Sequence, residues 1–303
     1  GLPTGAVIGF SNMLFKLLED SRSDDSKNKP THFAVIFDSA RKNFRNEIYK
    51  DYKGNRANKT RLRRHDHHFA NIEQEQEAMR YQFSRLVSYL DALPVTFLSM
   101  DGIEADDTIA YLTKHTQNDL DGEVVIVSTD KDFLQLVTDK VKVFSPTKKK
   151  LYDRQMVFDE YGIWPQNILL YRTLDGDKSD NIPGIKGCGL KTLLKRFPEL
   201  SEDKLITHDD FFQMCEDMKG KIKIYDDILG AKDQLLMNKR LMELKEPHIP
   251  TNQKLKILDR FNQNDIEFKK LDFLKVGQKY KILQNWRDIN DWLHSTFQNI
   301  IRK

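Results

Sequence analysis

The chain has little of what would indicate a membrane, secreted or repetitive protein. Its 303 residues include only two cysteines, Cys188 and Cys215, too few for a disulfide framework or a four-cysteine zinc site. It contains no internal repeat and no low-complexity tract. No run reaches the roughly 18 apolar residues of a transmembrane helix, and polar residues interrupt the first apolar stretch, so no signal peptide is predicted. We therefore expect an intracellular protein in a reducing compartment, without a membrane partner.

What is present is enough apolar material for a core and an uneven distribution of charge. Hydrophobic residues make up 39% of the chain, which suits one large or two modest domains. The net charge is only +3, but residues 41–64 alone carry +8, from ten basic and two acidic side chains. A block of one sign in an otherwise acidic chain indicates a polyanion as partner. The alternative is an ordinary solvated charged face.

Hydrophobic periodicity predicts an α/β protein. Helical spacing covers Pro3 to Asp20, Ile72 to Leu90 and Asp106 to His115. Short apolar runs of strand length are His32 to Phe37, Val95 to Ser99, Val124 to Ser128 and Lys140 to Phe144. Strands separated by helices predict a mainly parallel sheet flanked by helices. The basic stretch from Lys50 to His68 lacks a continuous apolar face, and after Tyr161 only helices are expected.

Acidic residues follow the strands of this sheet. They form four clusters: Asp38; Asp101, Glu104, Asp106 and Asp107; Asp130 and Asp132; Asp177 and Asp180. Parallel sheets bind ligands at the carboxyl ends of their strands, so three clusters should share one edge, to which the fourth can fold back. Carboxylates so close repel one another unless cations intervene, and oxygen ligands without His or Cys favour Mg²⁺ or Mn²⁺. The alternative is that these acids cap helices, as we expect for Asp101.

A glycine-rich segment, residues 181–192, follows the last acidic cluster. Gly184, Gly187 and Gly189 permit positive φ angles and close backbone approach. A helix is predicted directly after them, and three lysines add positive charge: Lys186, Lys191 and Lys195. The pattern is not a P-loop, because GxxxxGK[ST] is absent. It favours a helix–hairpin–helix that grips a DNA backbone without reading bases, with a plain helix–turn–helix core element as the alternative.

Five ordered motifs carry a resemblance to a known family. They are Val35 to Asp38 with Phe44-Arg45, Tyr52 to Arg56, Gly102 to Asp107, Ser128 to Asp132, and Gly176 to Gly184. In these motifs the chain resembles the 5′-nuclease family, which includes the 5′→3′ exonuclease domain of bacterial DNA polymerase I, flap endonucleases and phage ribonuclease H. The resemblance covers residues 1–245, and the final segment is weakly similar to the tail of the phage enzymes.

The resemblance implies a PIN-like core with a helix–hairpin–helix DNA-binding domain. The core would occupy residues 1–160 with a basic arch at about 41–70, the second domain 161–247, and a helical extension 248–303. Two Mg²⁺ or Mn²⁺ ions would be held by Asp38, Glu104, Asp106, Asp107, Asp130, Asp132, Asp177 and Asp180. Lys53 and Arg56 would hold the scissile phosphate, and Tyr52 would stack on a base. DNA contacts would come from Arg45, Arg61, Arg63, Arg64 and the glycine hairpin with its lysines, with K⁺ on the hairpin carbonyls.

The function implied is that of a structure-specific 5′ nuclease in DNA replication and repair. It would act as a monomer on 5′ flaps, 5′ ends and RNA–DNA hybrids, in the bacterial cytoplasm or a phage-infected cell, beside a polymerase or single-strand-binding protein. A non-catalytic binder of branched DNA and a PIN-type ribonuclease are the alternatives.

The family pattern also begins with an element that this sequence does not show. That element is a strand carrying an Asp, followed by a helix with a basic residue, and nothing before Pro3 supplies either. The chain also begins with Gly1 rather than Met. We therefore expect an amino-terminal truncation that removes one metal ligand.

Overall fold

The computed structural model describes residues 5–23, 30–39, 42–56, 63–64, 67–262 and 268–279, with residues 290 and 297. Its contacts group the chain into two compact units. The first comprises Gly1–Phe37, Lys59–Ser99 and Lys256–Lys303; the second comprises Asp38–Asn58 and Met100–Leu255. The division predicted at residues 160 and 247 stays a prediction. In the described ranges, none of the helices has the length and apolar character that crossing a membrane requires.

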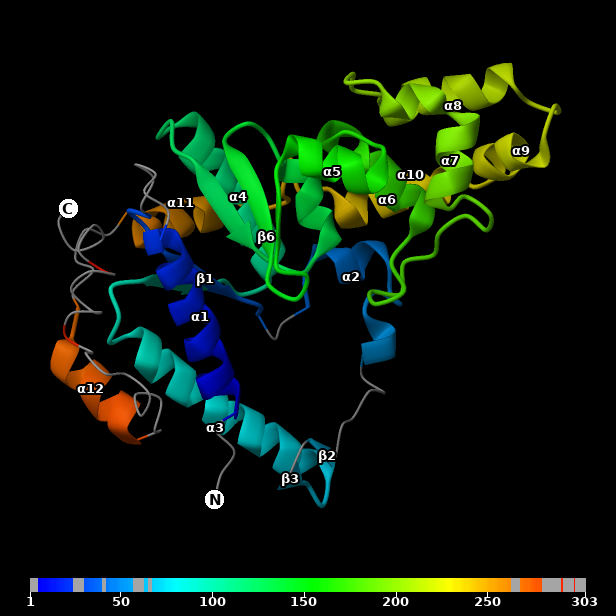
Figure 1. The fold of residues 1–303 in the computed structure, drawn as a ribbon. Coiled ribbons are helices and arrows are strands. Elements are labelled where there is room, and N and C mark those ends of the chain that lie inside the picture. The colour runs from blue at the N-terminus through cyan, green and yellow to red at the C-terminus, as the bar shows by residue number, and fades with distance from the viewer. Residues whose placement is uncertain are drawn as a thin grey trace. The chain divides into compact units, whose positions relative to one another are not determined.

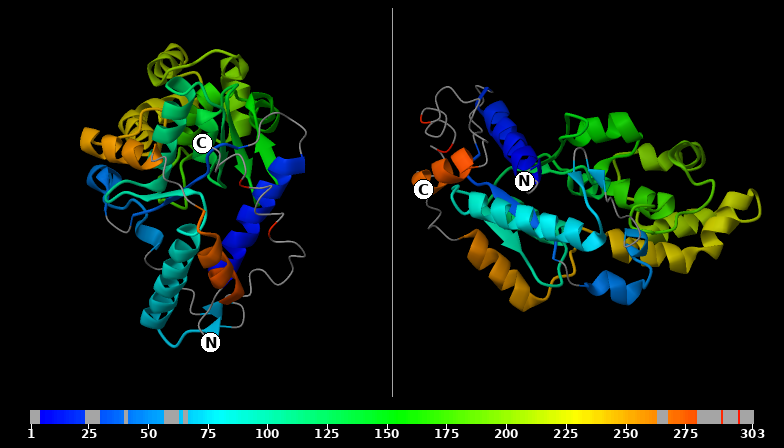
Figure 2. Two further views of the ribbon diagram at one scale, coloured as in Figure 1. Left: turned by 90° about the vertical axis from the view of Figure 1, so that its left-hand side faces the viewer. Right: turned by 90° about the horizontal axis from the view of Figure 1, so that it is seen from below.

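The first unit is a small α/β assembly around helix α3. Its elements are α1 (Gly5–Ser23), β1 (Ala34–Phe37), β2 (Arg63–Arg64), β3 (His67–His68), α3 (Ile72–Leu90), β4 (Thr96–Ser99) and α12 (Lys270–Lys279). Strands β1 and β4 are parallel, with Ala34 opposite Thr96. The Asn71 side chain caps α3 by accepting a bond from the Gln74 amide. Helices α1 and α12 both pack on α3 (Figure 2), where Leu14 and Phe273 belong to one apolar cluster.

The second unit contains the remaining strands and most helices (Figure 1). Its elements before the helical half are α2 (Phe44–Ile48), η1 (Gly54–Arg56), α4 (Ala105–Asn118), β5 (Val124–Val127), η2 (Lys131–Leu136), β6 (Val141–Ser145) and β7 (Lys150–Tyr152). Then follow α5 (Arg154–Tyr161), η3 (Pro165–Asn167), α6 (Ile168–Asp175), α7 (Leu190–Arg196), η4 (Pro198–Ser201), α8 (His208–Asp217), α9 (Lys223–Gly230) and α10 (Lys232–Met242). Helix α11 (Thr251–Phe261) begins in this unit and ends in the first.

The predicted α/β class is confirmed, and so are the four predicted strands. β5 and β6 are parallel, with Val124 opposite Val141, and β7 adds to β6 in the antiparallel sense. Two findings differ from the expected single sheet. Within the described ranges, β1–β4 and β5–β6–β7 are separate sheets. In addition, β7 was not predicted, because three residues are too few to show an alternating pattern.

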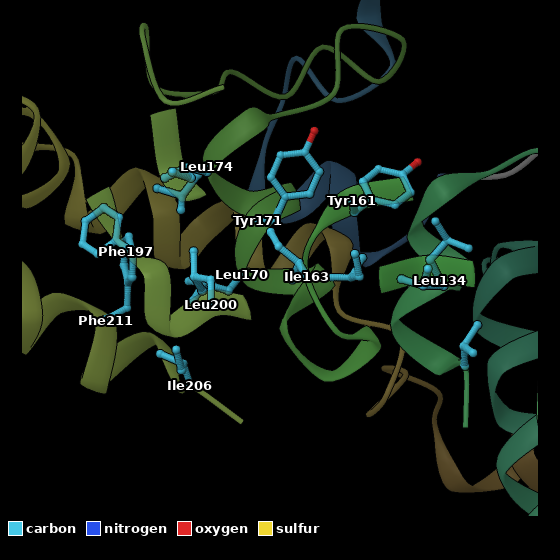
Figure 3. Close-up of a cluster of buried hydrophobic side chains, with 14 of the residues drawn as sticks. Leu134, Tyr161, Ile163, Leu170, Tyr171, Leu174, Phe197, Leu200, Ile206 and Phe211 are labelled. Carbon is cyan, nitrogen blue, oxygen red and sulfur yellow. The ribbon is translucent and has the colours of Figure 1, made fainter. Parts of the chain in front are cut away.

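One apolar cluster joins the strands of the second unit to its helical half. It includes Val141 and Val143 of β6, Leu170 and Leu174 of α6, and aromatic residues of the later helices. Figure 3 shows Phe197, Phe211, Leu200 and Ile206 together at one end of this cluster, with Tyr161 and Leu134 toward the other. The sheet edge and the glycine hairpin that follows α6 therefore share one core.

The glycines around the last acidic cluster allow a closed loop at the end of α6. Asp177 and Ile182 exchange two backbone hydrogen bonds of 2.9 and 2.8 Å, and the Ile185 amide donates to Leu174 O at 2.8 Å. Gly176 has a φ of +72°, and a Cβ at Gly184 would lie 2.1 Å from Asp175 O. Gly184 is therefore required for close backbone packing, independently of any role in DNA binding.

We predict that Gly184→Ala lowers the free energy of unfolding by about 2 kcal/mol or more, because the backbone must move to admit the methyl group. Gly189→Ala is the matched control, since a Cβ there meets nothing within 4 Å. Urea unfolding of both variants is the measurement. Equal stability of the two variants would contradict the close packing.

Candidate functional site

Carboxylates gather at the amino end of helix α4. The Ala105 amide donates to Asp38 Oδ1 at 2.8 Å, so Asp38, which directly follows β1, caps α4 from another segment. The N-cap residue itself, Glu104, makes no side-chain capping bond. Asp106 and Asp107 lie in the first helical turn, where the helix dipole favours negative charge.

Glu104, Asp106 and Asp107 form the first carboxylate group, and a buried arginine offsets part of its negative charge. Arg45 is held on α2, whose amino end is fixed by a capping box at Asn43. Its Nη1 and Nη2 donate to the two carboxylate oxygens of Asp107 at 2.5 and 3.0 Å. Its Nη1 also lies 3.4 Å from Glu104 Oε2. Arg45 and Asp107 are each only 1% exposed, so this is a fully desolvated, bidentate pair.

Lys53 supplies a second positive charge to the same group. Its Nζ lies 2.5 Å from Glu104 Oε1 and 4.0 Å from Asp180 Oδ2. The Tyr52 hydroxyl donates to Glu104 Oε2 at 2.9 Å and also contacts Asp180 Oδ2 at 3.3 Å. Burial alone would raise the pKa of Glu104, but Arg45 and Lys53 outweigh it and hold that pKa below its usual range. Glu104 is therefore an anion with fixed partners.

Asp106 behaves differently from its two neighbours. Burial raises the pKa of its carboxyl group to about 7, although the charge of Arg45 opposes the rise, and the negative charges of Asp107 and Glu104 add to it. In the described structure its Oδ1 accepts only from the Asp107 amide, at 2.9 Å. A carboxyl group with a raised pKa beside two anions is a place where a bound cation would be favourable.

A second carboxylate group consists of Asp130, Asp132 and Asp177. The Asp132 amide donates to Asp130 Oδ1 at 2.8 Å, so the Asp130 side chain caps the start of η2. Arg172 on α6 donates to Asp132 Oδ1 at 2.6 Å and to Asp177 Oδ2 at 2.7 Å. Burial raises the pKa of Asp132 to about 6 despite the opposing charge of Arg172. Arg172 therefore holds the Asp132 and Asp177 carboxylates on one guanidinium.

Asp177 and Asp180 connect the two groups. Asp177 Oδ1 accepts from the amide and the hydroxyl of Ser179, each at 2.7 Å. These bonds and the charge of Arg172 hold the pKa of Asp177 below its usual range, although burial acts in the opposite direction. The Ser179 hydroxyl also reaches Asp180 at 3.4 Å, and Asp180 in turn faces Tyr52 and Lys53. A continuous series of contacts thus runs from Asp132 to Glu104.

The donor chemistry of these groups fits divalent cations, but the side chains are arranged as ion pairs. Across the described residues, no three His, Cys, Asp or Glu side chains form a ready metal cluster. The carboxylates instead face Arg45, Lys53 and Arg172. Oxygen donors without nitrogen or sulfur suit Mg²⁺ or Mn²⁺. Occupation by metal would require the carboxylates to exchange a guanidinium or ammonium partner for the ion.

Two predicted DNA contacts are corrected by burial. Arg45 cannot contact DNA, because its guanidinium is enclosed and its Nε donates to Leu241 O at 2.7 Å. Tyr52 is 5% exposed and packs with Leu169 and Ile182, so its ring is not free to stack on a base. Both residues support the carboxylates instead.

The other predicted DNA-binding residues keep their status as predictions. Lys186, Lys191 and Lys195 are exposed, and Gly187, with a φ of +87°, has open space where a Cβ would point. These residues lie on the hairpin and on α7, as predicted. The side chains of Arg56, Arg63 and Arg64, and all of Arg61, fall outside the described part of the chain.

Arg172 is the site residue that the sequence reasoning missed. It is buried within α6, where all its neighbours from Ile168 to Leu174 are buried too. The available signal was one charged residue inside an apolar helical run, five positions before Asp177. Arginine is rarely buried without a charged partner, so this position indicated an internal ion pair.

The raised pKa of Asp106 predicts a pH-dependent gain from Asp106→Asn. A group with a raised pKa in the folded state stabilises the fold below its ordinary value of 3.8 and loses that contribution as the pH rises through about 7. Asparagine resembles the neutral acid. In EDTA, we expect the variant to exceed the native chain in unfolding free energy by about 2 kcal/mol at pH 8 and by much less at pH 4. Urea unfolding at both pH values measures this, and an equal gap at both would contradict it.

Comparisons with known proteins place the chain in a family. The 5′-3′ exonuclease N-terminal resolvase-like domain matches residues 1–162. The DNA polymerase I of Rhizobium leguminosarum is 33% identical over 248 residues, which are 81% of this chain and 22% of the polymerase. The 5′-3′ exonuclease of Aquifex aeolicus is 32% identical over 262 residues, with 81% of each chain covered. This chain thus spans less than a quarter of the length of the polymerases matched first.

The fold comparison agrees with the sequence comparisons. The bacteriophage T5 flap endonuclease, solved with DNA and metal ions, superposes with a TM-score of 0.61 at 22% identity. The match covers 89% of this chain and 91% of that chain, and it shows a common fold. The predicted resemblance is therefore confirmed: the chain belongs to the 5′-3′ exonuclease family.

Proposed function

We propose that this protein is a metal-dependent 5′ nuclease that hydrolyses phosphodiester bonds in DNA with 5′ flaps or free 5′ ends. One observation carries the proposal: in a member of the 5′-3′ exonuclease family, carboxylates from three separate chain segments lie against Arg45, Lys53 and Arg172, and Asp38 lies at the amino end of α4. A protein that only bound DNA would gain nothing from this negative charge, because phosphates are repelled by it. The retained carboxylates therefore favour the enzyme over the non-catalytic binder.

The carboxylates would hold two Mg²⁺ or Mn²⁺ ions. Asp130, Asp132, Asp177 and Asp180 would contribute from one side of the site, and Asp38, Glu104, Asp106 and Asp107 from the other, directly or through water. Such ions activate a water and stabilise the leaving oxygen of a phosphodiester when bound. The pKa values of Asp106 and Asp132 are raised to about 7 and about 6. Protonation of these carboxyl groups therefore predicts weaker ion binding as the pH falls through this range.

Lys53 would hold the scissile phosphate, together with Arg56. Its ammonium group is only partly exposed and already lies at the carboxylates, so a phosphate bound there would sit beside the ions. Glu104 and Asp180 restrict where the ammonium group can lie, which orients it before substrate arrives. Tyr52 helps by holding the Glu104 carboxylate.

The hairpin lysines and the basic residues of 41–64, apart from the buried Arg45, would bind the DNA backbone. Lys191 and Lys195 are four residues apart on α7 and exposed on one face of that helix. We also propose that K⁺ binds the hairpin carbonyls. The protein would act as a monomer in the cytoplasm and would contact a polymerase or a single-strand-binding protein. RNA–DNA hybrids would also be substrates if the protein recognises only the phosphate backbone. A substrate panel that includes single-stranded RNA distinguishes a 5′ nuclease from a PIN-type ribonuclease.

Replacing Asp130 and Asp177 together with Asn should abolish Mg²⁺-dependent cleavage of a 5′-labelled flap, with a loss of at least about 100-fold. Binding to the same flap in EDTA should remain, because neither carboxylate is proposed to contact DNA and Arg172 keeps Asp132 as its partner. Asp139→Asn with Asp159→Asn, two exposed acids, is the control and should cleave normally. Normal cleavage by the Asp130 and Asp177 variant would defeat the proposed metal site.

Replacing Lys191 and Lys195 with Ala should reduce the salt dependence of DNA binding. Each phosphate contact releases counterions, so the slope of log K against log salt should fall by about 2. Lys114→Ala with Lys140→Ala removes the same charge; Lys140 directly precedes β6, at the edge opposite the carboxylates, and this control should keep the slope. Fluorescence anisotropy at salt concentrations from about 50 to 200 mM measures the slope for both variants. Slopes that change equally would make Lys191 and Lys195 ordinary surface charge.

A further inference from the structure

Two segments far apart in the chain are joined by hydrogen bonds beside the carboxylates. We call them the clasp: residues 51–55 and residues 178–181. Asn181 Nδ2 donates to Asp51 O at 3.0 Å, and Asn55 Nδ2 donates to Lys178 O at 2.9 Å. Between these two bonds, the Lys53 amide donates to Asp180 O at 2.9 Å. Each segment thus contributes an asparagine side chain that bonds to the backbone of the other.

The clasp holds two residues in an uncommon backbone conformation. Lys53 has a φ of +56° and Asn181 a φ of +62°. Asparagine adopts this left-handed region with little penalty, whereas lysine does so at a cost. Strain of this kind persists where the surroundings impose it, and it occurs often at functional sites. The bonds on either side of Lys53 are the contacts that impose it here.

The conformation of Lys53 decides where its ammonium group lies. With this backbone its Nζ reaches Glu104 at 2.5 Å and lies 4.9 Å from the centre of the Tyr52 ring. The Tyr52 ring and Ile182 belong to one apolar cluster, so a residue within one segment of the clasp packs with a residue adjoining the other. A rotated Lys53 backbone would turn the ammonium group away from the carboxylates.

We propose that Asn181 and Asn55 are positioning residues for Lys53. They set the reach of the ammonium group through the clasp, because their side-chain amides donate to the backbone carbonyls of Asp51 and Lys178. Because Asn181 is the first residue of the glycine-rich segment 181–192, the clasp also connects Lys53 to that segment. This inference rests on the nuclease function proposed above, since it assigns Lys53 a phosphate to hold.

The test variant is Asn181→Gly, because glycine adopts a φ of +62° freely and removes only the amide bond to Asp51. We expect turnover at saturating flap substrate to fall about 10-fold, the size of effect expected when a reacting group is misplaced, with KM nearly unchanged. Asn55→Ala should act in the same direction and serves as the second variant. Asn252→Ala, an exposed asparagine on α11, is the control and should leave turnover unaltered.

A double-mutant cycle separates positioning from a general structural effect. If Asn181 acts through Lys53, Asn181→Gly should cost nothing further in a Lys53→Ala background. A loss that multiplies in that background would overturn the proposal.

A second readout does not depend on nuclease activity. Acylation of Lys53 by an amine-reactive ester, followed by peptide mass spectrometry, should be several-fold faster in Asn181→Gly than in the native chain, with Lys191 as internal reference. Unchanged labelling of Lys53 would also overturn the clasp. If the native chain cleaves no flap in Mg²⁺ or Mn²⁺, the proposed function fails, while the labelling result still decides the positioning role.

Discussion

The interaction on which the site depends is the pairing of crowded carboxylates with arginines from inside the protein. Arg45 and Arg172 each bridge two acidic side chains, and without them the acids of the first and second groups would repel one another in a partly desolvated place. Breaking a buried pair leaves an uncompensated charge and is more costly than never having formed it. The arginines therefore explain how a chain can gather so many acids at one place and still fold.

The rest of the second unit can be understood as a frame for these pairs. Helix α2 delivers Arg45, and α6 delivers Arg172 together with the loop that carries Asp177 and Asp180. Helix α6 contributes Leu170 and Leu174 (Figure 3) to the apolar cluster that also contains residues of β6 and α7, so these elements share one core.

Much of this arrangement was predictable, and the failures have a common cause. The strand ends and their acids follow from local apolar runs, and helix α3 was predicted at its observed limits, Ile72–Leu90. The roles of Arg45 and Tyr52 were wrong because a basic or aromatic residue in a charged stretch was expected to face solvent. Their partners lie far away in sequence, as with Arg45 and Leu241, which are 196 positions apart. Periodicity reports local structure and carries no information about such contacts. The roles of Arg172, Asn55 and Asn181 were not predicted, for the same reason.

Divalent ions can bind these carboxylates only if they replace the arginine or lysine partners. Crystals grown with Mn²⁺ test it most directly, because anomalous scattering locates the metal independently of any assay. We expect Mn²⁺ within coordinating distance of Asp130, Asp132, Asp177 or Asp180, with Arg172 moved away from at least one carboxylate. Saturating Mn²⁺ that leaves both arginine pairs intact and binds at none of these acids would contradict it.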